Sequence, residues 1–277
     1  MEGCRRLHLH ERGCPPLAHY AKIDTQLIGT VGLIWLNEPD TRNAMSYQML
    51  EDLNAAVGEL SGQARALVLS GRGYGFCSGA GLNGIDGGNG AAPDYGLSLE
   101  THVNPLLTRL RDLPIPWITA VRGGAAGFGC SLALAGDLIV ASESALFVQS
   151  FARVGLVPDG GSTYLLTRSL SRVRAMEMML LGERITGRQA FEWGMVNRLV
   201  ADDRLEEEAL ALATRLAEGP TAALRITRRM AWAALDANWE LALRAEREGQ
   251  RAAGLTADFQ EGLDAFRDRR PPRFDGR

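Results

Sequence analysis

Two loops rich in small residues are the part of this sequence best suited to chemistry. The first covers residues 75–82 (GFCSGAGL) and the second covers residues 120–129 (AVRGGAAGFG). Each follows an apolar run typical of a buried strand, at 66–69 and at 117–121. Such loops expose main-chain N–H groups, and two of these groups that meet at one oxygen stabilise the enolate form of a thioester. Either loop alone could simply join a strand to a helix, but together they predict an oxyanion hole.

The segment after the second loop supports this prediction. Residues 131–135 (SLALA) are typical of a helix that begins directly after the glycines. The free N–H groups and the positive end of the helix dipole would then point at the same place. An anion bound there would be stabilised by both.

The two loops, in this order and followed by residues 135–141 (AGDLIVA), resemble the crotonase family, also called the enoyl-CoA hydratase/isomerase superfamily. The resemblance runs from about Gln26 to Arg277. It implies that the N–H groups of Ala80 and Phe128 bind the thioester oxygen. The sequence departs from the family at Gly81, because the residue after the first N–H donor is commonly Asp.

The resemblance also bears on the type of reaction. Family hydratases hold a water molecule between two glutamates, one on the helix after the second loop and one further along the chain. These two positions are Ser131 and Phe151 in this sequence. Neither side chain accepts a proton at neutral pH, so the sequence disfavours water addition.

Asp159 offers a different carboxylate, within residues 155–163 (GLVPDGGST). It matches the position at which family isomerases, among them the 1,2-epoxyphenylacetyl-CoA isomerases, keep their acidic group. One carboxylate is enough for isomerisation, because it can remove a proton at C2 or C4 and return it at the other carbon. Pro-Asp-Gly is also a common turn, so Asp159 could instead cap a helix that starts near Ser162. The absence of the hydratase glutamates favours catalysis.

Coenzyme A recognition is implied by the resemblance. The family binds the adenine and pantetheine through a loop that corresponds to residues 42–44 and through the backbone of 78–82. A C-terminal segment with aromatic and basic residues, 266–274 here, approaches CoA elsewhere in the family. The expected contacts are Arg42, Ala44, Ser78, Gly79, Leu82 and Phe266. Arg42 and the charged tail could equally be solvated.

The elements that would position these residues alternate along the chain. Residues 26–36 are typical of a hairpin with its turn at Gly29, and a helix that ends at Leu60 follows. Strands, loops and helices then alternate to Val200, which predicts an α/β fold with right-handed crossovers and a buried sheet. In crotonases such β-β-α units wind into a spiral, and the resemblance implies that spiral here.

Beyond Asp202 the pattern predicts helices alone, at 204–218 and at 221–257. Such helices bury one face on their own core, so a partner surface is expected. The resemblance implies a homotrimer or homohexamer, and the alternative is a helical cap on a monomer. We expect three parts, an N-terminal extension at 1–20 that is mobile, a crotonase core at 21–202, and a C-terminal helical trimerisation region at 203–277.

Composition limits the other function classes. The chain has 277 residues, 46% of them hydrophobic, and a net charge of −3, which indicates a compact enzyme rather than a protein that binds nucleic acid or a membrane surface. It shows no apolar run of membrane-spanning length and no signal-peptide core, so the cytoplasm is expected. The only lysine is Lys22, which argues against a Schiff-base nucleophile.

Two N-terminal and loop features complete the sequence predictions. Cys4, His8, His10 and Cys14 are metal-ligand residue types, but their spacing matches no common zinc site and no metal is expected. Residues 87–93 (GGNGAAP) suggest a mobile lid over the acyl group. We expect no cofactor beyond the coenzyme A of the substrate.

The sequence thus predicts an acyl-CoA isomerase that shifts a double bond through an oxyanion-stabilised enolate. Another crotonase reaction, such as hydration, hydrolysis or ring opening, is the nearest alternative. A CoA-binding paralogue without activity is a third, and Gly81, Ser131 and Phe151 would suit it. The sequence does not reveal the acyl group.

Overall fold

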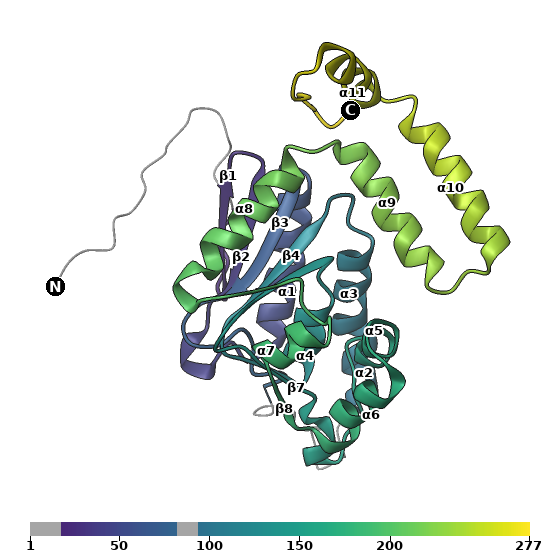
Figure 1. Cartoon of the computed structure of the whole chain (residues 1–277). Helices are drawn as coiled ribbons and strands as arrows, with labels where there is room; N and C mark the ends of the chain where they lie inside the picture. Colours follow the sequence, from purple (N-terminus) through teal and green to yellow (C-terminus); the bar gives the residue numbers. More distant parts are fainter. Residues whose placement is uncertain (1–17, 82–93) are drawn as a thin grey trace.

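A six-stranded sheet forms the centre of the molecule (Figure 1). The computed structural model describes residues 18–81 and 94–277. Within them the strands of this sheet lie in the order β1-β2-β3-β4-β6-β9, and every neighbouring pair except β1 and β2 is parallel. The strands are β1 (Ile23–Ile28), β2 (Val31–Leu36), β3 (Ala66–Gly71), β4 (Trp117–Val121), β6 (Leu138–Ser142) and β9 (Arg198–Val200).

Three expected features lie wholly or largely outside the described residues. They are most of the N-terminal extension at 1–20, the proposed CoA contact Leu82 and the proposed lid at 87–93.

The predicted hairpin and first helix are confirmed. β1 and β2 pair in antiparallel register from Ile23 and Leu36 to Ile28 and Val31, on either side of the Gly29 turn. Helix α1 (Tyr47–Ser61) begins where the Ser46 hydroxyl accepts a hydrogen bond from the Met49 N–H. This side-chain cap satisfies one of the N–H groups that a helix start leaves free.

Both faces of the large sheet are covered, as the alternation along β2 shows. Ile34 and Leu36 belong to one apolar cluster with α1, whereas Leu33 and Trp35 belong to a second cluster on the opposite face. Helix α8 (Leu205–Ala217) supplies the second cluster with side chains that include Leu205. A parallel sheet that is buried on both faces agrees with the predicted crossovers.

A second, three-stranded sheet lies beyond the carboxyl ends of the large sheet's central strands. It consists of β5 (Gly124–Ala126), β7 (Leu146–Val148) and β8 (Arg184–Thr186), with β5 and β7 parallel and β7 and β8 antiparallel. The second glycine loop therefore contains a short strand, which the sequence did not predict.

Helices and short turns connect the strands. Ahead of β4 lie η1 (Pro39–Thr41), α2 (Tyr95–Ser98), η2 (Leu99–Val103) and α3 (Asn104–Arg111). After β5 follow α4 (Phe128–Leu134), η3 (Ser150–Val154), α5 (Ser162–Ser169), α6 (Arg172–Leu181), α7 (Gly187–Glu192) and η4 (Asp202–Arg204). Helix α4 begins at Phe128 rather than after the glycines, because Gly127 ends the loop and Gly129 is already helical.

The predicted long helix at 221–257 is wrong as a single element. The structure has α9 (Thr221–Ala234) and α10 (Trp239–Ala253) in that region, and a further helix, α11 (Ala257–Asp268), begins where the region ends. The Asn238 side chain caps α10 and the Thr256 side chain caps α11, each by accepting a hydrogen bond from a main-chain N–H of the first turn. Two capping residues inside a continuous helical pattern explain the breaks.

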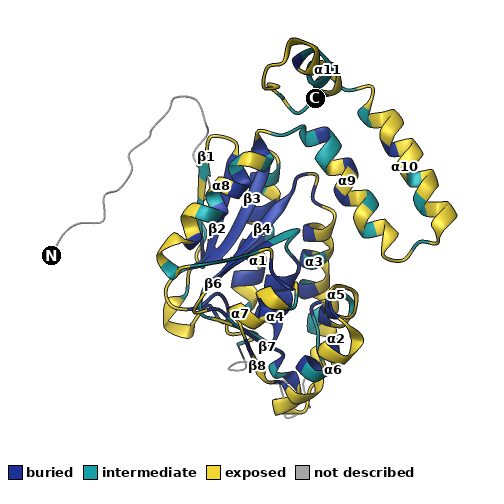
Figure 2. Ribbon diagram, viewed as in Figure 1, coloured by how far each residue is buried: buried dark blue, intermediate teal, exposed yellow. Residues whose placement is uncertain are grey.

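Arg228 attaches α9 to the rest of the molecule. This buried guanidinium pairs with Asp137 and donates to the main-chain carbonyls of Leu110 and Leu113. Figure 2 shows that the central strands β2, β3 and β4 are buried, whereas α10 presents mostly exposed residues.

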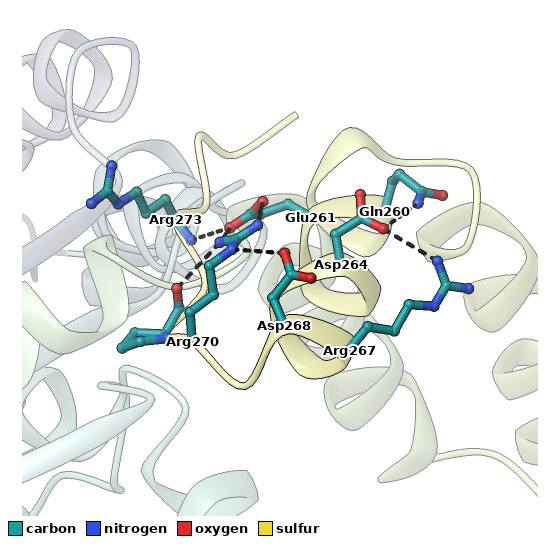
Figure 3. Close-up of polar contacts among 8 residues, drawn as sticks. Gln260, Glu261, Asp264, Arg267, Asp268, Arg270 and Arg273 are labelled. Carbon is teal, nitrogen blue, oxygen red and sulfur yellow. Dashed lines mark hydrogen bonds and ion pairs between the residues drawn. The ribbon is translucent and has the colours of Figure 1, made fainter.

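The C-terminal tail folds back on α11. Both Glu261 carboxylate oxygens accept hydrogen bonds from the Arg270 guanidinium, at 2.7 and 2.9 Å, and the Arg273 N–H donates to the same carboxylate at 2.7 Å (Figure 3). Arg65, just ahead of β3, donates to the Phe274 carbonyl at 3.0 Å. The tail is thus held beside the amino end of the central strands.

None of the helices in the described residues combines the length and the apolar composition needed to cross a bilayer.

Candidate active site

The two glycine loops meet, as the sequence predicted. Cys77 of the first loop pairs with Ala125 of the second in a parallel bridge. The Cys77 N–H donates to the Gly124 carbonyl at 3.1 Å, and the Ala126 N–H donates to the Cys77 carbonyl at 3.0 Å. Both loops follow the carboxyl ends of neighbouring parallel strands, β3 and β4, so the sheet brings them together.

Two glycines allow this close approach. A Cβ atom at Gly129 would lie 2.2 Å from the Cys77 carbonyl oxygen. At Gly79, where φ is +98°, a Cβ atom would lie 2.7 Å from the Ala126 carbonyl oxygen and 3.7 Å from the Phe128 nitrogen. The main chains of the two loops are therefore in direct contact, and the Phe128 N–H lies next to the residue that precedes Ala80.

The N–H groups of Ala80 and Phe128 are available to a ligand. Met45 forms a bridge with Ala80 through hydrogen bonds to the two residues on either side of Ala80. The Met45 N–H donates to the Gly79 carbonyl at 2.7 Å, and the Gly81 N–H donates to the Met45 carbonyl at 3.1 Å. In a parallel bridge of this kind the N–H of the central residue faces away. Phe128 is the first residue of α4, whose opening N–H groups have no partner within the helix. Within the described residues neither N–H group has an acceptor.

Asp159 lies in the turn between η3 and α5, and its carboxyl group is unusual. The residue is half-buried, and within the described residues its Oδ1 atom is buried without a hydrogen-bond partner. This burial raises the pKa of Asp159 to about 6. The carboxyl group can therefore exchange a proton near neutral pH.

The alternative role of Asp159 as a helix cap is wrong. Helix α5 has Gly161 at its N-cap position, and no side chain makes a capping hydrogen bond there. The main-chain carbonyl of Asp159, not its carboxylate, accepts from the Ser162 N–H at 3.1 Å. The carboxyl group is thus left without a local structural task among the described residues.

The Asp159 turn lies against the start of α4. A Cβ atom at Gly160 would lie 2.9 Å from the Phe128 ring and 2.7 Å from the Ser131 Cβ. The Ser131 hydroxyl donates to the Asp159 carbonyl at 2.9 Å. The fold therefore gathers the three predicted catalytic residues, Ala80, Phe128 and Asp159, from three separate loops.

The two residues at the family's hydratase positions also lie here. Ser131 is fully buried, and its hydroxyl is engaged with main-chain carbonyls and with Ser162. The ring of Phe151 is buried in η3, 3.8 Å from where a Cβ atom of Gly127 would be. An aromatic ring therefore packs beside the second loop, at the residue that the resemblance aligns with the second hydratase glutamate.

Four of the predicted CoA contacts, Arg42, Ala44, Ser78 and Gly79, lie close together, and their role in binding stays a prediction. The Ser78 N–H donates to the Arg42 carbonyl at 3.0 Å, and the Ser78 hydroxyl donates to the Thr41 carbonyl at 3.0 Å. Ala44 lies in the same turn as Arg42. The N–H of Met45, the residue after Ala44, donates to the Gly79 carbonyl at 2.7 Å. The Arg42 side chain is exposed and makes no hydrogen bond or ion pair within the described residues.

Asn43 shapes this region and was not singled out from the sequence. It is fully buried, and its side-chain amide donates to the carbonyls of Arg72, Gly75 and Phe76 at 2.9–3.2 Å. Its φ of 56° is a left-handed conformation that Asn tolerates better than most residues. The signal in the sequence that could have identified this residue was an Asn within a tight turn.

Phe266 is not brought to this loop within one chain. It lies on α11 with 83% of its surface exposed, beside the tail that Arg65 holds at the amino end of the strands. The loops follow the opposite, carboxyl end. Basic residues of the segment are also occupied, because Arg267 pairs with Asp264 and Arg270 pairs with Glu261 (Figure 3).

A cavity of about 840 Å³ adjoins the Asp159 turn. It lies between α3, α5 and α9, and its lining includes Leu107, Gly160, Gly161, Tyr164 and Trp232. Its size suits a small-molecule ligand. No sequence pattern predicted it, because its walls come from helices that are far apart along the chain.

Comparison with known proteins agrees with this geometry. The enoyl-CoA hydratase/isomerase family model matches residues 27–277. The 1,2-epoxyphenylacetyl-CoA isomerase of Escherichia coli K12 is 42% identical over 246 residues, which cover 87% of this chain and 94% of that protein. A protein named probable enoyl-CoA hydratase from Rhodobacter capsulatus is 40% identical over 264 residues, 93% of this chain and 99% of its own length.

The fold agrees as well. The crystal structure of an enoyl-CoA hydratase from Polaromonas sp. JS666 superposes with a TM-score of 0.85 at 31% identity and covers 91% of this chain and 99% of its own. All strands except most of β1, the paired glycine loops and the C-terminal helices lie within the residues that the family model matches. The chain has the crotonase fold, and it belongs to the enoyl-CoA hydratase/isomerase family.

Proposed function

We propose that this enzyme of the crotonase family is an acyl-CoA isomerase that moves a double bond along the acyl chain. The observation that supports it best is Asp159, whose Oδ1 atom is buried without a hydrogen-bond partner among the described residues and whose turn packs against the start of α4. The hydratase positions hold Ser131 and Phe151, which leaves Asp159 as the acid/base of this site. The 42% identical isomerase supports the same choice.

The proposed reaction follows from the geometry. The thioester oxygen accepts hydrogen bonds from the N–H groups of Ala80 and Phe128, which lowers the energy of the enolate. The Asp159 carboxylate removes a proton from C2 of a 3-enoyl-CoA, and the electrons of that C–H bond move into a dienolate whose negative charge lies on the thioester oxygen. The same carboxyl group then delivers a proton to C4, which leaves the double bond between C2 and C3 and restores the carboxylate. A pKa of about 6 keeps the group ready for both steps.

The same site is proposed to hold the coenzyme A portion of the substrate. The exposed Arg42 is free to meet a phosphate, and Ala44, Ser78 and Gly79 offer main-chain groups. Leu82, outside the described residues, stays a prediction. Coenzyme A enters only as part of the substrate, and we propose a cytoplasmic enzyme.

Hydration is the second candidate function, because a relative and a similar structure both carry the name enoyl-CoA hydratase. The packing of Phe151 beside Gly127 disfavours it, since a ring takes the place of the second carboxylate. A paralogue that binds CoA thioesters without turnover is a further alternative.

A screen of acyl-CoA thioesters in deuterated water, followed by mass spectrometry, tests the proposal. We expect 3-enoyl-CoA substrates to yield 2-enoyl isomers that carry exchanged deuterium, with little hydration of crotonyl-CoA. Robust addition of heavy water to crotonyl-CoA would instead identify a hydratase. Binding without any deuterium exchange would identify the inactive paralogue.

A further inference from the structure

A buried hydrogen-bonded chain supports the turn that carries Asp159. Gln149, Ser131 and Ser162 are each fully buried. The Gln149 side-chain amide donates to the Ser162 hydroxyl at 3.1 Å, and the Ser162 hydroxyl is in contact with the Ser131 hydroxyl. Both hydroxyl groups lie at the main-chain carbonyl of Asp159, at 2.9 Å from Ser131 and 3.0 Å from Ser162.

The number of available protons limits how the hydrogen bonds of this chain can be arranged. Each serine hydroxyl has one proton to donate, and the Ser162 hydroxyl already accepts from Gln149. One arrangement that satisfies every group has the Ser162 hydroxyl donating to the Ser131 oxygen while the Ser131 hydroxyl donates to the Asp159 carbonyl. The Ser162 N–H supplies a second bond to that carbonyl, at 3.1 Å. Hydrogen bonds that are linked in one direction in a buried site strengthen one another.

Ser131 also connects this turn to the oxyanion loop. It lies in the first turn of α4, three residues after Phe128, and its hydroxyl is 3.3 Å from the Gly127 carbonyl. Gly160 closes the contact from the other side, because even a Cβ atom there would lie 2.7 Å from the Ser131 Cβ. One serine thus touches both the loop that offers the Phe128 N–H and the turn that carries the acid.

We propose that Ser131, Ser162 and Gln149 are positioning residues that hold the Asp159 carboxyl group at a set place relative to the N–H groups of Ala80 and Phe128. This inference rests on the proposed function. It gives Ser131 a task at the position where family hydratases keep a glutamate: the side chain supports the acid/base from behind. A proton shuttle between two carbons needs this support, because an error of about 1 Å in the position of a catalytic group costs about 100-fold in rate.

The kinetic test uses Ser131→Ala and Ser162→Ala with a 3-enoyl-CoA such as trans-3-hexenoyl-CoA. We expect kcat to fall about 10- to 100-fold in each variant while KM stays within about 2-fold, since neither hydroxyl meets the substrate. Ser142→Ala is the matched control. Ser142 lies at the end of strand β6, is also fully buried, and its hydroxyl forms a hydrogen bond with the hydroxyl of another serine, Ser144. Loss of kcat no greater than in this control overturns the proposal.

A variant in the Asp159→Asn background separates this inference from the proposed function. If Ser131 acts through Asp159, Ser131→Ala should change turnover in that background by less than about 2-fold, because contributions of residues that act as a unit are not additive. An unaffected Asp159→Asn enzyme would overturn the proposed function itself. Full loss in Asp159→Asn with no effect of Ser131→Ala would overturn only the positioning role.

A measurement without substrate completes the test. The titration of Asp159 can be followed by carbon NMR of aspartate-labelled protein, with Asp159→Asn identifying the signal. Burial alone raises this pKa to about 6. A loosened turn lets water reach Oδ1, so Ser131→Ala and Ser162→Ala should lower the pKa, whereas Ser142→Ala should leave it unchanged. Identical titrations in all four proteins, including the wild type, would overturn the proposal.

Discussion

At the scale of single residues, Asp159 shows how a turn residue becomes reactive. A buried carboxylate oxygen normally finds a hydrogen-bond donor, and Oδ1 of Asp159 has none within the described residues. The shift in its pKa comes from burial alone, without help from a neighbouring charge. Ionisable groups with strongly shifted pKa values are concentrated at functional sites, where they lower stability but take part in the chemistry.

The first prediction concerns turnover. Asp159→Asn keeps the shape of the side chain but cannot take up a proton, so isomerisation should fall by about 10²–10⁴-fold, the usual contribution of general acid/base catalysis. Thioester binding, measured by calorimetry with a saturated acyl-CoA, should change little because the N–H groups of Ala80 and Phe128 remain. Near-wild-type turnover with unchanged binding would show that another group moves the proton.

The second prediction concerns stability against pH. Burial raises the pKa of Asp159 to about 6 from 3.8, so between these values the folded protein holds a proton that the unfolded chain has released. The free energy of unfolding therefore falls as pH rises through this window. Asp159→Asn removes that penalty, so its Tm should exceed that of the wild type at about pH 7 and approach it at about pH 4.

The control for this comparison is Asp40→Asn, which changes an exposed carboxyl group. Scanning calorimetry of the three proteins at both pH values is sufficient. A Tm difference between Asp159→Asn and wild type that is the same at both pH values would show that the carboxyl group is not destabilised by burial.

At the scale of elements, the oxyanion hole depends on two loops packed main chain to main chain. Gly129 is the tightest point, because a Cβ atom there would lie 2.2 Å from the Cys77 carbonyl oxygen. Main-chain atoms cannot rotate away as a flexible side chain can. The loops would therefore have to separate to accept any side chain at this position.

The third prediction follows from this contact. Gly129→Ala should lower the free energy of unfolding by about 2 kcal/mol or more, the cost of forcing an extra methyl group into a packed core, and should abolish turnover because the two N–H groups move apart. Gly124→Ala is the matched control in the same loop, since a Cβ atom there meets no described atom within 4 Å. Equal stability of the two variants in urea would show that the loops can yield.

At the scale of the whole molecule, the C-terminal helices leave apolar side chains uncovered. Trp239 and Leu243 on α10 are 72% and 45% exposed, and Leu255 after it is 82% exposed. Gly249 is the one buried residue of α10. Because this helix buries so little on its own chain yet presents large apolar side chains, we predict that it contacts another subunit.

The fourth prediction is therefore a homotrimer or homohexamer at micromolar concentration, measured by sedimentation. Deletion after Asp203 should give insoluble or inactive protein, because it removes α8, which packs Leu205 and Ala209 on one face of the large sheet. Deletion after Leu235 spares α8 and α9 and should yield smaller assemblies instead. A fully active wild-type monomer would show that α10 and α11 have no partner subunit.

The sequence by itself determined the features that depend on near neighbours. The hairpin around Gly29, the start of α1 at Ser46 and the helical nature of the C-terminal third all follow from period and capping residues. The two glycine loops were recognisable because loop composition and the preceding apolar runs are local. Their pairing was implied by resemblance to a family and is confirmed by the bridge between Cys77 and Ala125.

Tertiary structure alone decided how the site is built. Whether the Asp159 carboxyl group caps a helix or stands without a partner depends on atoms of α4, η3 and α5, which meet only after the sheets have formed. The same holds for Ser131, which the sequence marked only as a missing glutamate, and for Phe266, which folding places at the opposite end of the strands from the loops. Burial and hydrogen-bond partners are set by contacts between distant segments, and local patterns do not encode them.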